Sequence, residues 1–234
     1  MSLNEAYTRG SNSPPQKKIC ISAISTDFSE LLKNLSFFEK ESVASLHIDI
    51  MDGHFVPRLG MYSELISEIA RKTTIPIDIH LMVTNPFDYI SEFAKLGVAQ
   101  IIPHIESTPH IHRLLSQILM SKVKAGIAIN PGTSIHNLED LFSIVSSVLV
   151  MGINPGIKGH TLIESTPARV KAIRVLANNL DFKGTIDVDG GITFENLMTL
   201  CDAGANRFVC GAGTVFKSET SIETNLHKLL DLLS

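Results

Sequence analysis

The chain has 234 residues, of which 44% are hydrophobic and 19% are charged, as expected of a globular protein rather than a disordered segment. Its 20 Lys and Arg against 24 Asp and Glu give a net charge of −4, and there is no basic tract. This balance argues against nucleic acid or an anionic membrane surface as a partner. No apolar run has the length of a membrane span.

Residues 1–16 are polar and rich in Ser, Asn and Pro, without the apolar stretch of a secretory signal, so we expect a flexible N-terminal tail there. The three cysteines (Cys20, Cys201 and Cys210) are widely spaced, and each lies in an apolar context. They predict buried free thiols in a reducing compartment, and the cytoplasm is the expected location.

From Lys17 onward, short apolar runs alternate with longer amphipathic stretches. The predicted strands are Ile19–Ile24, Ser45–Met51, Ile77–Met82, Gln100–His104, Lys124–Ile129, Ser147–Met151, Gly184–Asp189 and Arg207–Cys210. The predicted helices are Phe28–Glu39, Tyr62–Lys72, Pro86–Lys95, Ile111–Ser121, Ile135–Ser146, Ala168–Asn179, Phe194–Ala203 and Ile222–Leu233. Strands separated by helices pair in parallel, and eight such units predict one α/β domain, a (β/α)8 TIM barrel over residues 17–234.

An open doubly wound sheet is the structural alternative to this barrel. It would call for a glycine-rich turn after the first strand, but residues 24–27 read Ile-Ser-Thr-Asp and contain no glycine. The barrel is therefore favoured, and its active site is expected on the loops that follow the carboxyl ends of the strands.

Polar residues interrupt three strands that burial should make almost entirely apolar. Because side chains alternate between faces, His47 and Asp49 share one face of the second strand, and His80 and Asp189 occupy matching positions on the third and seventh. If these faces point inward, two imidazoles and two carboxylates converge near the top of the barrel. That set suits one divalent metal ion such as Zn, Fe, Mn or Co.

His104 ends the fourth predicted strand, and Glu106 follows it. The pair could orient a metal ligand from behind, or His104 could be a structural core histidine. The sequence leaves both interpretations open.

Four segments resemble the signature segments of the ribulose-phosphate 3-epimerase family. They are LHIDIMDGHFVP (46–57), IDIHLMVTNPFDYI (77–90), INPG (153–156) and IDVDGGI (186–192), and ISAISTDF (21–28) resembles the family's first strand. The resemblance runs from about Ile19 to Phe216, with the segments in the family's order.

The resemblance implies a role for each matching residue. His47, Asp49, His80 and Asp189 would bind the metal, and Asp49 and Asp189 would be the acid/base pair. Substrate would be bound by Ser22, His80, Met51, Met82, Met151, Gly156, Ile157, Lys158, Gly159, Gly190, Gly191, Gly211 and Ala212. The methionines would form an apolar cap over the reacting carbon, and the glycine-containing loops would hold the phosphate.

The implied reaction is epimerisation at carbon 3 of a ketose phosphate, converting D-ribulose 5-phosphate to D-xylulose 5-phosphate in the pentose phosphate pathway. Two aspartates would transfer the proton through a metal-stabilised enediolate. The expected partners are the small ketose-phosphate substrate and, in a homo-oligomer, further copies of the chain. D-Allulose 6-phosphate 3-epimerisation is the closest alternative, and a non-catalytic sugar-phosphate-binding protein is a third.

The departures from the family pattern gather at the phosphate end. Ile157 replaces an aromatic residue and Lys158 a glycine, Gly152 stands where a hydroxyl is usual, and Arg58 stands where asparagine is usual. The strand-eight turn, Gly211-Ala212-Gly213-Thr214, lacks a hydroxyl directly after its first glycine, so Thr214 is a candidate substitute. Lys158 either supplies charge to the phosphate or is a solvated loop lysine.

Overall fold

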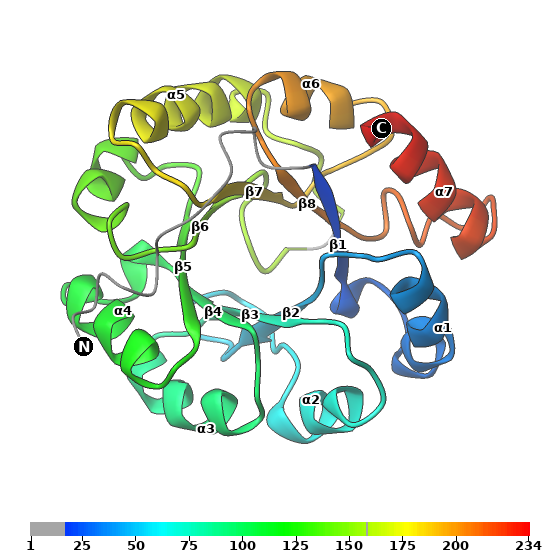
Figure 1. Cartoon of the computed structure of the whole chain (residues 1–234), viewed down its shortest axis with the longest axis horizontal. Coiled ribbons are helices and arrows are strands. Elements are labelled where there is room, and N and C mark those ends of the chain that lie inside the picture. The colour runs from blue at the N-terminus through cyan, green and yellow to red at the C-terminus, as the bar shows by residue number, and fades with distance from the viewer. Residues whose placement is uncertain (1–16, 158) are drawn as a thin grey trace.

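The computed structural model describes residues 17–157 and 159–234, so the predicted tail over 1–16 and Lys158 lie outside the described residues. Eight strands pair in sequence order, all in parallel, and the last pairs with the first to close a barrel. Figure 1 shows them as an inner ring surrounded by helices. They are β1 (Lys18–Ser22), β2 (Ser45–Met51), β3 (Ile77–Met82), β4 (Gln100–Pro103), β5 (Lys124–Ile129), β6 (Ser147–Met151), β7 (Thr185–Asp189) and β8 (Arg207–Cys210). The predicted (β/α)8 barrel is confirmed.

The outer layer consists of α-helices and shorter 3-10 helices. The α-helices are α1 (Phe28–Lys40), α2 (Ser63–Ala70), α3 (Ile90–Lys95), α4 (Ile111–Met120), α5 (Thr166–Asn179), α6 (Leu197–Asp202) and α7 (Ile222–Leu233). The 3-10 helices are η2 (Ala23–Ser25), η3 (Pro86–Tyr89), η4 (Ile105–Ser107) and η5 (Ile135–Leu141). α1 shows the common pattern, in which Leu31, Leu35 and Phe38 recur at helical spacing and are buried against the strands.

The predicted α-helix over Ile135–Ser146 is wrong, because η5 occupies Ile135–Leu141 and turns follow it. Its buried residues Leu138 and Leu141 are three apart, a spacing that suits a 3-10 helix as well as an α-helix. Asn137 and Asp140 are weak helix formers, and the β-branched pair Ile144 and Val145 follows. Burial of Leu138 and Leu141 therefore stabilises 3-10 turns here, since the sequence does not strongly favour an α-helix.

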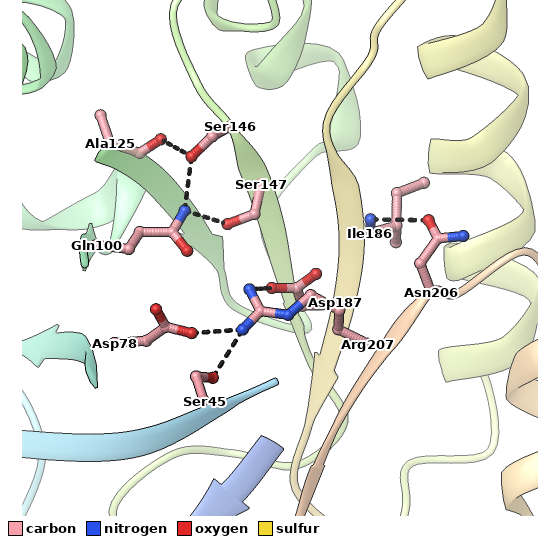
Figure 2. A network of polar contacts seen from close by, with 10 residues as sticks. All are labelled: Ser45, Asp78, Gln100, Ala125, Ser146, Ser147, Ile186, Asp187, Asn206 and Arg207. Atoms are coloured by element: carbon pink, nitrogen blue, oxygen red, sulfur yellow. Dashed lines mark hydrogen bonds and ion pairs between the residues drawn. The ribbon is translucent and has the colours of Figure 1, made fainter. Parts of the chain in front are cut away.

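The amino-terminal end of the barrel interior holds a polar network (Figure 2). One nitrogen of the Arg207 guanidinium donates to Asp78 Oδ2 and, at 2.7 Å, to Ser45 Oγ, and the other donates to Asp187 Oδ2 at 3.2 Å. Beside it, Gln100 donates to Ser146 and Ser147 at 2.8 and 2.7 Å. The inward faces that carry the candidate metal ligands thus also carry Asp78 and Asp187, which Arg207 neutralises at the opposite end of the barrel.

We expect Arg207→Met to lower the free energy of unfolding by about 3–5 kcal/mol, because it leaves the buried Asp78 and Asp187 without a cationic partner. Urea denaturation followed by circular dichroism measures the loss. Arg71→Met is the matched control, since Arg71 pairs with Glu68 on the surface and should be replaceable without measurable loss. Equal stability of the two variants would contradict the prediction.

The three cysteines are free and buried, as predicted, and burial raises the pKa of the Cys20 thiol to about 12. Across residues 17–157 and 159–234, no helix combines the length and apolar character needed to cross a membrane.

Candidate active site

Parallel register brings the predicted metal ligands to the same level of the barrel. Asp49 on β2 lies opposite His80 on β3, and Met151 on β6 lies opposite Asp189 on β7. Strand alternation points these side chains inward, where His47, Asp49 and His80 are buried and Asp189 is half-buried. The convergence expected from the sequence is therefore present.

The four side chains form a compact cluster. His80 Nδ1 lies 3.0 Å from Asp49 Oδ1, 3.3 Å from His47 Nε2 and 3.7 Å from Asp189 Oδ2. His47 Nε2 lies 3.4 Å from Asp49 Oδ1 and 3.8 Å from Asp189 Oδ2. One ligand atom from each residue lies within 4.8 Å of all the others.

The donor set fits a divalent cation. Two imidazole nitrogens and two carboxylate oxygens are ligands that Zn, Fe, Mn and Co accept. A cation between them would also offset the cost of burying two carboxylates close together. His47, Asp49, His80 and Asp189 are thus the residues that could hold such an ion.

Burial and the neighbouring charged groups shift the pKa values of His47, Asp49 and Asp189. Burial opposes charge on His47, but its hydrogen bond to Asp49 and the surrounding carboxylates raise its pKa to about 9. Burial disfavours ionised Asp49 as well, yet hydrogen bonds from His47 and His80 hold the pKa of Asp49 well below its usual range. For Asp189 burial prevails and raises the pKa. The pKa values of the two carboxylates therefore shift in opposite directions.

Behind the cluster, His104 lies against His80. The ring stacks on that of His80 with centroids 5.0 Å apart, and burial lowers the pKa of His104 to about 4. Nδ1 of His104 contacts Glu106, whose pKa is lowered because hydrogen bonds from His104, Thr133 and Asn130 outweigh the effect of burial. The structure thus places His104 next to a candidate metal ligand, with Glu106 behind His104.

Asp52, a further acidic residue in the motif of residues 46–57, has a structural role. Its Oδ1 accepts the backbone N–H groups of His54 and Phe55, and its Oδ2 accepts the backbone N–H and the hydroxyl of Thr84. Asp52 therefore joins the loop after β2 to the loop after β3 and is not a member of the metal cluster.

A cavity of about 890 Å³ opens above the cluster at the carboxyl ends of the strands. Most of the predicted substrate-binding residues line it: Ser22, Met51, Met82, Met151, Gly156, Ile157, Gly159, Gly190, Gly191, Gly211 and Ala212, together with Asp49 and Asp189. His47 and His80 do not line the cavity but support its floor through Asp49 and Asp189. The predicted site residues are thus brought together in the cluster or around the cavity, with two exceptions. His80, also expected to bind substrate, does not reach the cavity, and Lys158 lies outside the described residues.

One departure from the family pattern, at Gly152, has a steric explanation. A Cβ on Gly152 would lie 2.4 Å from the Gly190 carbonyl oxygen, so no side chain fits where a hydroxyl is usual. A Cβ on Gly211 would lie 2.2 Å from Ser25 Oγ, so the Ser25 hydroxyl occupies the space beside this turn. Thr214 is fully buried, and its hydroxyl lies 3.3 Å from the Gly211 carbonyl oxygen, so it does not replace the missing hydroxyl in the cavity.

Sequence reasoning did not identify every residue that lines the cavity. Ser25 could have been found as the next hydroxyl after Ser22, one turn along the chain. Arg58 stood out only as a departure from the family pattern, yet it is the only Lys or Arg among the described lining residues. His160, Thr161, Thr193 and Asn196 reach the cavity through loop folding, which no pattern in the sequence indicates.

A closed parallel barrel whose strand ends surround a cavity with paired carboxylates and imidazoles defines a barrel enzyme with a candidate metal centre. The ribulose-phosphate 3 epimerase family model matches residues 18–216. The chain therefore belongs to the ribulose-phosphate 3 epimerase family, and it is an isomerase.

Curated relatives agree with this assignment. The chain is 36% identical to ribulose-phosphate 3-epimerase of Bacillus subtilis, over 86% of this chain and 94% of the relative. It is 38% identical to the Aquifex aeolicus protein of the same name, over 80% of this chain and 84% of the relative. A solved mutant tryptophan synthase α-subunit from Pyrococcus furiosus superposes with a TM-score of 0.67, covering 94% of this chain and 99% of that one. At 14% identity, that likeness shows the fold alone.

Proposed function

We propose that this protein converts D-ribulose 5-phosphate to D-xylulose 5-phosphate by inverting carbon 3 in a metal-dependent, two-base reaction. The observation that carries the proposal is the placement of Asp49 and Asp189. They come from β2 and β7, line the same cavity, and share a cluster with His47 and His80. Inverting a carbon requires a base on each face, and non-adjacent strands can supply one from each side.

In the forward reaction, one aspartate removes the hydrogen of carbon 3 as a proton. The electrons of that C–H bond form the C2–C3 double bond, while the carbonyl π electrons move to the ketone oxygen and give an enediolate. The other aspartate then delivers a proton to the opposite face of carbon 3, and the ketone re-forms. A divalent ion, when bound, supplies a Lewis acid that stabilises the charge developing on the ketone oxygen.

Three methionines keep water from the reacting carbon. Met51, Met82 and Met151 are at most 6% exposed and stand at the ends of β2, β3 and β6, where all three line the cavity. Their sulfur atoms are polarizable and suit contact with a planar anion. Excluding water also prevents a solvent proton from reaching the enediolate on the wrong face.

We assign Ser22, which lines the cavity, to the ketone end of the substrate. The Ser25 hydroxyl donates to Ser22 Oγ at 2.9 Å. Because Ser22 accepts this bond, its own hydroxyl hydrogen is available to a substrate oxygen in the cavity. Ser25 thus orients Ser22 as well as filling the space beside Gly211.

We assign the phosphate to the glycine-rich side of the cavity. Gly190, Gly191, Gly211 and Ala212 lie on the loops after β7 and β8, where backbone N–H groups bind phosphate in many barrels. Gly156, Ile157 and Gly159 border the same cavity. Arg58 adds a positive charge that favours an anionic substrate.

D-Allulose 6-phosphate is the second candidate substrate. The cavity volume of about 890 Å³ is near the upper end of the usual range for small-ligand sites, so it has room for one more carbon. Of the altered residues, Ile157 lines the cavity and Gly152 packs against Gly190, on the side assigned to the phosphate.

A coupled assay with Mn²⁺, Fe²⁺, Co²⁺ or Zn²⁺ supplied tests the choice. We expect turnover of ribulose 5-phosphate to exceed that of allulose 6-phosphate in kcat/KM. The reverse order would assign the six-carbon substrate, and binding of both without turnover would indicate a non-catalytic sugar-phosphate-binding protein.

A further inference from the structure

His80 makes contacts through both of its ring nitrogens. Nδ1 faces the candidate metal cluster, 3.0 Å from Asp49 Oδ1. Nε2 points the other way and lies 2.9 Å from Nε2 of His104, which follows β4. Both rings are completely buried. A close contact between two buried ring nitrogens requires one of them to donate and the other to accept.

Glu106 sets the direction of this hydrogen bond. Its Oε2 lies 3.2 Å from His104 Nδ1, and an ionised carboxylate can only accept. His104 therefore carries its hydrogen on Nδ1 and offers the lone pair of Nε2. His80 must then donate from Nε2, so Nδ1 is the ring nitrogen left for a metal. The hydrogen that Nδ1 shares with Asp49 in the metal-free protein leaves when the metal binds.

Glu106 is itself held in place. Its Oε1 accepts the backbone N–H of Asn130 at 2.8 Å and the hydroxyl of Thr133 at 2.5 Å, both in the loop after β5. The carbonyl oxygens of those two residues accept from Arg169 on α5. Both carboxylate oxygens of Glu106 are thus occupied by donors, which leaves the carboxylate little freedom to turn.

We propose that His104 and Glu106 are positioning residues, which fix the orientation and hydrogen placement of His80 so that its Nδ1 binds the metal. The proposal rests on the proposed function, because it assigns a metal-binding role to His80. Partners of this kind behind a ligating histidine commonly change metal affinity by about 10- to 100-fold.

The rival explanation is that His104 only fills space in the core. It packs on His80 and also contacts Phe55, with ring centroids 4.9 Å apart. His104→Phe keeps a ring in this position but removes the acceptor. His104→Gln loses the ring but can present an amide oxygen to His80 Nε2. The two explanations therefore rank these variants in opposite order.

The test is a calorimetric titration of the purified full chain with Mn²⁺ alone, which measures the Kd for the metal. We expect His104→Phe to weaken Mn²⁺ binding by about 10- to 100-fold and His104→Gln to bind close to wild type. Glu106→Gln should weaken binding to a similar degree. Its amide oxygen is retained by Asn130 and Thr133, so its NH₂ group faces His104 and reverses the hydrogen placement along the pair.

Glu139→Gln is the matched control. Glu139 lies 2.5 Å from Nδ1 of the exposed His136 on the surface, so the variant removes the same charge from a histidine–carboxylate pair without touching the cluster. We expect it to bind Mn²⁺ like the wild type. An equal loss in Glu139→Gln and Glu106→Gln would overturn the proposal.

Wild-type affinity in a folded His104→Phe or Glu106→Gln variant would overturn the positioning role. The Glu106 side chain is 22% exposed, so Glu106→Gln is expected to fold. It therefore tests the proposal even if His104→Phe does not fold. A different result would contradict the proposed function. In that case the wild-type protein would bind Mn²⁺ but epimerise neither ketose phosphate.

Discussion

Asp49→Asn and Asp189→Asn should each lower kcat for epimerisation by about 10²- to 10⁴-fold, the usual contribution of a general acid or base. Asparagine keeps the size of the side chain but cannot take up or deliver the proton. Each variant retains one carboxylate in the cavity. We therefore expect each to exchange the carbon-3 hydrogen of one epimer with solvent without converting it to the other.

Asp187→Asn is the control for this pair. Asp187 lies on the same strand and the same face as Asp189, but at the Arg207 end of the barrel. An amide oxygen at this position can still accept from Arg207, and Arg207 keeps its ion pair with Asp78, so the neutral side chain should be tolerated. Circular dichroism establishes that all three variants are folded. A double variant of Asp49 and Asp189 with wild-type turnover would refute the two-base mechanism.

Removal of the metal should abolish turnover, and adding Mn²⁺, Fe²⁺, Co²⁺ or Zn²⁺ should restore it. Lewis-acid stabilisation is worth several kcal/mol, so the loss should amount to about 10²-fold or more. His80→Ala should lower the metal content, because His80 Nδ1 lies within 4 Å of three other candidate ligands. Dialysis against a chelator, metal analysis and the coupled assay measure these effects.

Stability gives a second readout of metal binding. An ion that binds only the folded protein raises the free energy of unfolding by about 2.7 kcal/mol at a concentration 100 times Kd. The melting temperature of the chelated protein should therefore rise as metal is added, and that of His80→Ala should rise less. Full activity of the metal-free protein, with no change in melting temperature, would contradict metal dependence.

The fold could be predicted because strand burial leaves a clear pattern. The central strands are buried on both faces, as β2 and β3 show, and amphipathic stretches separate them. The exception is η5, where buried residues at a spacing of three do not distinguish an α-helix from 3-10 turns. Local spacing identifies the buried face but not the pitch of a short helix.

The metal cluster could also be predicted, because in a parallel barrel residues at matching positions on neighbouring strands lie at the same level along the barrel axis. Asp49 and His80 stand at the same height on neighbouring strands. Ser25 could not be linked to Gly211 in this way, since their contact depends on how a loop after β1 meets a turn after β8. The pairing of Arg207 with Asp78 and Asp187 likewise depends on side chains from three strands meeting inside the closed barrel.

The most direct test of the central claim is proton NMR of ribulose 5-phosphate incubated with the Zn²⁺-loaded protein in D₂O. The two-base mechanism predicts xylulose 5-phosphate that carries deuterium at carbon 3 and at no other carbon, because the second aspartate returns a solvent-derived proton. Xylulose 5-phosphate that keeps its original hydrogen at carbon 3, or no xylulose 5-phosphate at all, would contradict this mechanism.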